Sequence, residues 1–77
     1  MSGRLPVLRP VEVVRALEKA GWYTHRQKGS HLIMHKTGSP NLIVIPMHNR
    51  DLLRGTLNGI LSDAELSVEE FFELLRR

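Results

Sequence analysis

The residues best suited to chemistry lie together in one short segment, Gly29 to His35. Glycine tolerates the positive φ of a tight turn, so the segment predicts a turn that leads into a strand near His31. Side chains alternate between the two faces of a strand, which puts His31 and His35 on one face and Leu32 and Met34 on the other. Leu32 and Met34 are the natural core pair. We therefore expect His31 to be accessible while the strand ladder holds it in place.

The same alternation excludes two kinds of catalytic site. Residues four apart on a strand are separated by about 13 Å, whereas zinc–nitrogen bonds are about 2 Å long, so His31 and His35 cannot share a metal ion. Ser30 and His31 point to opposite faces, and no G-x-S-x-G elbow surrounds the serine. Cysteine is absent, which removes disulfides and thiolate metal sites. We expect neither a metal nor a cofactor.

Cleavage of RNA is chemistry that a histidine without a metal can perform. RNA supplies its own nucleophile, the 2′-hydroxyl group, so the protein must add a proton acceptor, a proton donor and cations beside the phosphate. An imidazole can accept or donate a proton near neutral pH. The basic residues available to contact phosphate groups are Arg26, Lys28, Lys36, Arg50 and Arg54. A structural or idle histidine fits the same pattern, so residue chemistry alone leaves both interpretations open.

Charge is distributed unevenly along the 77 residues, whose formal net charge is +3. Residues 1–54 hold nine of the eleven Lys and Arg residues but only three of the eight acids, and all four histidines lie between positions 25 and 48. The middle of the chain therefore suits a polyanionic partner. A solvated basic face without a ligand is an equally good interpretation of the charge alone.

The length of the chain predicts one domain, residues 1–77, with a small core. Its longest apolar run, Leu42 to Met47, falls well short of the roughly 18 residues that cross a membrane. The first ten residues lack the apolar stretch of a signal peptide. Together with the lack of cysteine, these features predict a soluble cytoplasmic protein.

Periodicity and turn signals predict an α+β fold in the order α-β-β-β-α-α, with a three-stranded antiparallel sheet covered by helices on one face. A first helix is expected from Pro10, burying Val11, Val14 and Leu17 and ending before Gly21. Two further helices are expected at the end of the chain. One covers about residues 56–64, and the other follows a capping box formed by Ser67 and Glu70.

The strands are expected at residues 22–27, 30–36 and 41–46, joined by a Lys28-Gly29 turn and a Thr37–Pro40 turn. The third strand, with four consecutive apolar residues, is expected to be the most buried. Trp22 is assigned to the core and Tyr23 to the surface, where it could stack on a base.

Several stretches of the sequence, in their order and spacing, resemble the HicA (YcfA-like) toxins, which are mRNA interferases of bacterial toxin–antitoxin pairs. The stretches are Gly21-Trp22, Arg26 to His31, Ile45 to His48, Gly55 to Leu57 and Ile60-Leu61, and the likeness covers roughly residues 10–75. The resemblance implies a fold like that of double-stranded-RNA-binding domains. It also implies metal-independent cleavage of mRNA and a HicB-type antitoxin that covers the active face.

The same resemblance assigns the cleavage chemistry to His31, the histidine of the Gly-Ser-His motif, as general acid or base. Gly29 and Ser30 would form the turn that presents it, and Lys28 would contact a phosphate. A non-catalytic RNA-binding module and a protein-interaction module remain alternatives on the same fold.

Four positions near these motifs call for separate expectations. His35 and His48 have no assigned role, and the second catalytic group is unidentified. His25 is expected to be a solvated strand residue. Family members often have glycine where this chain has Glu65, and glutamate tolerates a positive φ poorly, so we expect the preceding helix to end differently here.

Overall fold

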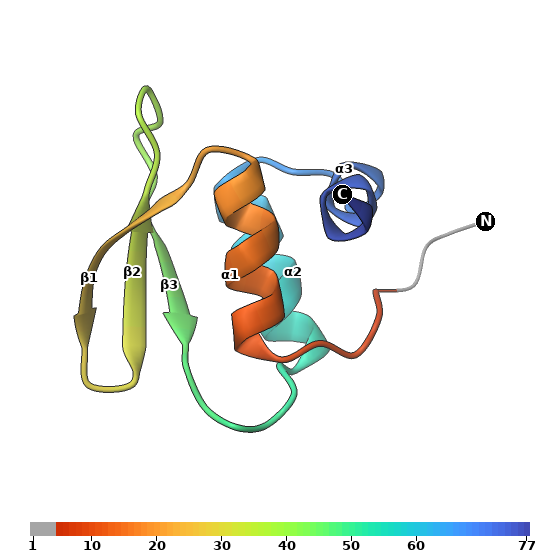
Figure 1. Cartoon of the computed structure of the whole chain (residues 1–77), viewed down its shortest axis with the longest axis horizontal. Helices are drawn as coiled ribbons and strands as arrows, with labels where there is room; N and C mark the ends of the chain where they lie inside the picture. The colour runs from red at the N-terminus through yellow and green to blue at the C-terminus, as the bar shows by residue number, and fades with distance from the viewer. Residues whose placement is uncertain (1–4) are drawn as a thin grey trace.

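The computed structural model describes residues 5–77, in which three helices lie on one side of a three-stranded sheet (Figure 1). In chain order the elements are α1 (Pro10–Lys19), β1 (Tyr23–Lys28), β2 (His31–His35), β3 (Ile43–Pro46), α2 (Arg54–Ala64) and α3 (Val68–Arg76). The predicted α+β order is confirmed. The segment considered for a signal peptide begins at residues 1–4, outside the described part. Within residues 5–77, no helix has the length and apolar character needed to cross a membrane.

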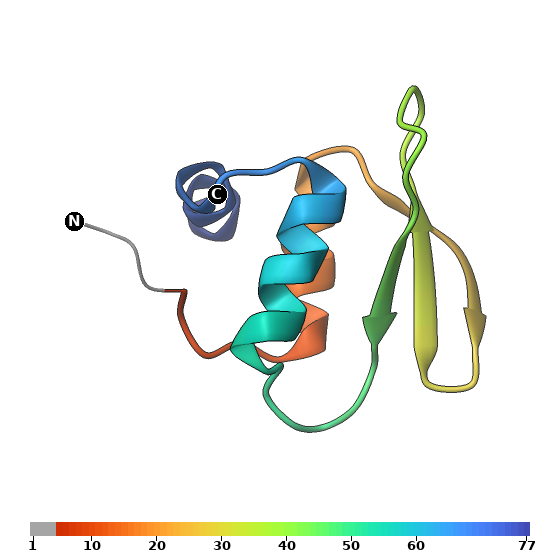
Figure 2. The ribbon, with the colours of Figure 1, turned by 180° about the vertical axis from the view of Figure 1, so that it is seen from behind.

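The sheet is antiparallel, with β2 between β1 and β3. Its inner face meets α1 and α2, and α3 lies beyond them, farther from the sheet (Figures 1 and 2). The buried side chains of the sheet come from the two strands nearer the helices: Leu32, Met34, Ile43 and Ile45. Every residue of β1 is exposed, because the helices do not extend across that strand. Within residues 5–77, no helix covers the outer face of the sheet (Figures 1 and 2).

A β-bulge in β1 decides which of its side chains lie on this outer face. The register shifts between Thr24 and Arg26, which leaves His25 as the extra residue. Regular alternation from Tyr23, which pairs with the outer face of β2, would turn Arg26 and Lys28 toward the helices. The extra residue reverses the alternation, so both cations join Tyr23 on the outer face.

The third strand has the largest share of buried residues in the sheet, as predicted, but it is buried on one face only. Burial along β3 alternates, with Ile43 and Ile45 in the core and Val44 43% exposed. Leu42, just before the strand, is 50% exposed. β3 is an edge strand with helices on only one face, so its apolar run does not reflect burial on both sides.

The first helix buries Val14 and Leu17 as predicted, but not Val11. Its core residues are Pro10, Val13, Val14, Ala16 and Leu17, whereas Val11 is 44% exposed. The spacing of positions 10, 13, 14 and 17 describes one helix face, and Val11 lies to the side of it. The segment after the helix meets the expectation for Trp22, which is buried, although β1 begins one residue later than predicted.

The C-cap of α2 also differs from expectation. The helix starts at Arg54, two residues early, and ends at Ala64 as predicted. Its C-cap residue, Glu65, adopts the left-handed conformation with φ 59° and ψ 39°. The expectation that glutamate would change this helix end is wrong. The backbone hydrogen bonds Leu66 N to Leu61 O (3.0 Å) and Glu65 N to Ser62 O (3.1 Å) close the helix in the manner usually reserved for glycine.

The last helix matches its capping prediction and completes the core. The Glu70 backbone N donates to Ser67 Oγ at 3.0 Å, and the Ser67 N donates to the Glu70 carboxylate at 2.8 Å. Phe71 and Leu74 are buried. The Lys19 ammonium group donates to Leu74 O at 3.1 Å, which links the end of α1 to α3.

Candidate active site

His31 is the first residue of β2 and follows a two-residue turn formed by Gly29 and Ser30. Gly29 has a φ of 60°, in the region that glycine adopts without strain. The turn falls one residue later than predicted, because Lys28 is already paired with His31 in the ladder. The Gln27 side-chain amide donates to Gly29 O at 3.2 Å and stabilises the turn. The backbone of His31 is thus fixed while its side chain is exposed.

On the outer face of the sheet, His31 lies between a cationic residue and an apolar residue. Lys28 of β1 and Pro46 of β3 are its direct cross-strand neighbours. Side chains in such positions have Cβ atoms about 4.5–5.5 Å apart, so the Lys28 ammonium group can reach an anion held at the imidazole. None of the side-chain hydrogen bonds found within residues 5–77 uses the His31 imidazole. Both ring nitrogens are available to a ligand.

The loop between β3 and α2 lies beside this turn, at the lower end of the sheet in Figure 1. Met47 N donates to Ser30 O at 2.6 Å, which extends the strand pairing one step beyond β3. Farther along, Leu52 N donates to Leu8 O at 2.8 Å and fastens the loop to the segment before α1. The loop is therefore held next to the histidine-bearing turn at one end and next to the start of α1 at the other.

His48 lies in this loop, which makes it the other histidine at this end of the sheet. Its Nδ1 accepts a hydrogen bond from Arg50 N at 3.2 Å, so Nε2 is the ring nitrogen left for other contacts. An open hollow of about 270 Å³ is lined by Arg9, Val11, Met47, His48 and Asn49. Sequence reasoning did not single out Arg9, because its proximity to His48 depends on how the loop folds back toward α1.

Four of the five predicted phosphate-binding residues lie on the outer face or at this end of the sheet. Lys28 is opposite His31. Arg26 is on the same face of β1, two residues before Lys28. Arg50 is in the β3–α2 loop, and Arg54 begins α2 directly after it. All four side chains are exposed.

Lys36 is placed apart from the other four. It follows the far end of β2, about 16 Å along the strand from His31 at 3.3 Å per residue. Its side-chain stem lies over Gly21, where an added Cβ would stand 3.3 Å from Lys36 Cε. The structure therefore does not bring Lys36 to the turn that carries His31.

The electrostatic setting of the site follows from the composition of the strands. None of β1, β2 and β3 contains Asp or Glu. Asp51 is the only acid in the segment between β3 and α2. Across residues 5–77, no three His, Asp or Glu side chains are grouped so that they could hold a metal ion. The arrangement is suited to binding an anion and to moving a proton at the imidazole.

Fold and site together define a small α+β protein with an exposed histidine, His31, opposite an exposed lysine, Lys28, at one end of its sheet. The family model for the HicA toxin of bacterial toxin–antitoxin matches residues 11–66, from α1 through α2 to the residues just before α3. The chain therefore belongs to the HicA toxin family. Comparison with curated proteins gives no match. Family membership makes this protein the toxin of a toxin–antitoxin system, with a cognate antitoxin as its partner.

Proposed function

We propose that this toxin is a metal-independent endoribonuclease that cleaves messenger RNA in the cytoplasm, with His31 as general acid or base. The observation that carries the proposal is the exposed imidazole of His31 directly opposite Lys28, on strands without a carboxylate. An imidazole in such a position can exchange a proton with an RNA ribose or leaving group while the neighbouring ammonium group faces the phosphate.

The reaction needs no group beyond RNA and the protein. The ribose 2′-oxygen attacks the adjacent phosphorus and loses its proton to a base, while the bond between phosphorus and the 5′-oxygen breaks. The departing 5′-oxygen takes up a proton from an acid. The products are one RNA end with a 2′,3′-cyclic phosphate and one with a 5′-hydroxyl group. In this proposal His31 performs one of the two proton transfers.

In this proposal the basic residues contact different phosphate groups of the RNA. Lys28 neutralises the phosphate that reacts, because it is the cation closest to His31 in the strand register. Arg26, Arg50 and Arg54 contact the flanking phosphates, and these contacts hold the RNA strand in place relative to the imidazole. Lys36 is too far along β2 to act at the same phosphate.

We further infer that the antitoxin is of the HicB type and that it inhibits the toxin by covering the outer face around His31. Two features support this site of inhibition. None of the described helices lies over the outer face (Figure 1), and β1 is exposed along its whole length. A protein seated there would exclude RNA from the imidazole without any change in the toxin fold.

The test is incubation of the purified toxin with a defined single-stranded RNA in excess chelator, beside a mock purification. We expect fragments that carry 2′,3′-cyclic phosphate and 5′-hydroxyl ends. RNA that is bound but left intact would instead indicate a non-catalytic RNA-binding module. Failure to bind or cleave RNA, with a stable antitoxin complex, would indicate a protein-interaction module. Cleavage that stops on chelation would contradict metal independence.

A further inference from the structure

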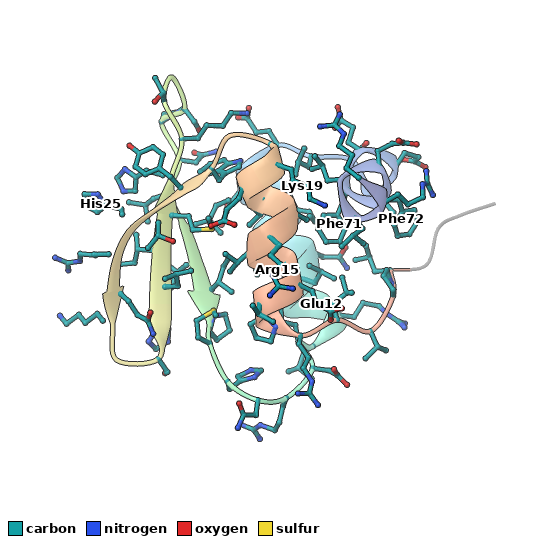
Figure 3. All side chains as sticks on the ribbon, viewed as in Figure 1. Glu12, Arg15, Lys19, His25, Phe71 and Phe72 are labelled. Atoms are coloured by element: carbon teal, nitrogen blue, oxygen red, sulfur yellow. The ribbon has the colours of Figure 1, made fainter. Side chains whose placement is uncertain are left out.

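Three aromatic rings form a cluster on the outer face of the sheet, away from His31. The rings of His25 and His35 are stacked, with centroids 4.3 Å apart and planes 26° apart. The Tyr23 ring lies 6.4 Å from that of His35, tilted by 44°. Tyr23 is 49% exposed, and Figure 3 shows His25 directed away from the helices. We call these three side chains the ring cluster.

The β1 bulge is what assembles the ring cluster. Tyr23 pairs with His35, so these two side chains share the outer face through the strand register. The extra residue of the bulge is His25, and the bulge directs it against the same neighbour, His35. None of the three rings belongs to the buried core, which lies on the other face of the sheet. Their grouping is therefore available for contact with a ligand.

The charges around the ring cluster indicate what kind of ligand fits. The strands carry Arg26 and Lys28 on the same face and have no acid. A ligand that complements both the cations and the ring faces must be anionic and have flat, unpaired ring systems of its own. Single-stranded nucleic acid has both properties. A duplex has the charge, but its base faces are already stacked on each other.

We propose that the ring cluster is a stacking platform for an unpaired base of the RNA substrate, so that the toxin acts on single-stranded RNA. This inference rests on the proposed ribonuclease function, since it assigns the substrate class of that site. His35 lies about 13 Å from His31 along β2 at 3.3 Å per residue. That distance corresponds to about four stacked nucleotides at roughly 3.4 Å each. Arg26, between the two positions on β1, is placed to contact the intervening phosphates.

The experiment measures binding without cleavage. The probe is an unstructured, fluorescently labelled 12-nucleotide 2′-O-methyl RNA, which lacks the 2′-hydroxyl nucleophile, and its duplex with the complementary strand. Tyr23→Ala is expected to weaken binding of the single strand by roughly 5- to 150-fold, the effect of about 1–3 kcal/mol per stacked base. Tyr23→Phe keeps the ring and should retain the affinity. The matched control is Thr24→Ala, an exposed neighbour in β1 that pairs with the buried Met34 on the other face.

The outcomes of this experiment test the stacking platform independently of the proposed ribonuclease function. Equal affinities for Tyr23→Ala and Thr24→Ala would overturn the platform, and so would tighter binding of the duplex than of the single strand. Loss of antitoxin binding with unchanged RNA affinity would overturn it as well, by making the ring cluster a protein-docking surface. Cleavage of the matching unmodified RNA by the parent protein is scored separately. Ring-dependent binding without cleavage would support the platform and contradict the ribonuclease proposal.

Discussion

Replacement of Glu65 by glycine should stabilise this protein. Glu65 is the only non-glycine residue among the described ones with a positive φ, and its side chain is exposed. A left-handed conformation costs an L-residue about 1–2 kcal/mol. Glycine avoids that cost but loses about 0.5–1 kcal/mol more backbone freedom on folding. The backbone contribution alone should therefore raise the free energy of unfolding by about 0.5–1 kcal/mol.

The backbone contacts at this helix end do not depend on the glutamate side chain. The two capping hydrogen bonds, from Glu65 N and Leu66 N, are made by the main chain and persist in the variant. For a domain of this size, 1 kcal/mol corresponds to a change in Tm of about 4–8 °C. Thermal unfolding followed by circular dichroism should thus show a Tm increase of roughly 2–8 °C from this backbone change alone.

Glu65→Ala is the matched control for Glu65→Gly. Both variants remove a carboxylate from the negative end of the α2 dipole, which is itself a stabilising change of about 0.3–1 kcal/mol. Only the glycine variant also removes the Cβ atom. The difference in Tm between the two variants therefore isolates the backbone strain. An alanine variant as stable as the glycine variant would refute the reasoning.

Three further substitutions follow from the same structure. Gly59 lies inside α2, where an added Cβ meets no atom within 4 Å. Gly59→Ala should therefore raise the free energy of unfolding, measured in urea, by about 1 kcal/mol. A decrease would mean that the surroundings of this helix position are more crowded. Phe71→Ala, which empties a fully buried site, should cost about 3–5 kcal/mol in the same assay, and a loss below 1 kcal/mol would contradict the central place of Phe71 in the core. Lys28→Gln should weaken RNA binding and reduce the slope of log affinity against log salt by about 0.7; an unchanged slope would show that Lys28 contacts no phosphate.

Local sequence signals were enough to predict much of this structure. The capping box at Ser67 and Glu70 depends on residues three apart and formed as expected. The burial of Leu32 and Met34 followed from strand alternation alone, and so did the exposure of His31. These features depend on a few neighbouring residues, and for that reason a single sequence specifies them.

Features that depend on distant elements could not be predicted in the same way. The bulge at His25 is a property of how β1 pairs with β2, and it decides that Lys28 faces the same side as His31. The exposure of Val44 reflects helices that cover only one face of β3. The separation of Lys36 from His31 is different, because both residues lie in one predicted strand and the rise of about 3.3 Å per residue already places them about 16 Å apart. The number and order of charged residues in the sequence indicate neither the bulge nor the exposure of Val44.

The most direct test of the central claim is the single-turnover cleavage rate of His31→Ala against the parent protein, on one defined RNA and with chelator present. General acid–base catalysis contributes about 10²- to 10⁴-fold, so we expect at least a 100-fold loss of rate. Because the side chain is exposed and without hydrogen bonds in the described structure, stability should change by no more than about 0.5 kcal/mol. A folded His31→Ala variant that cleaves RNA at the parent rate would contradict the account.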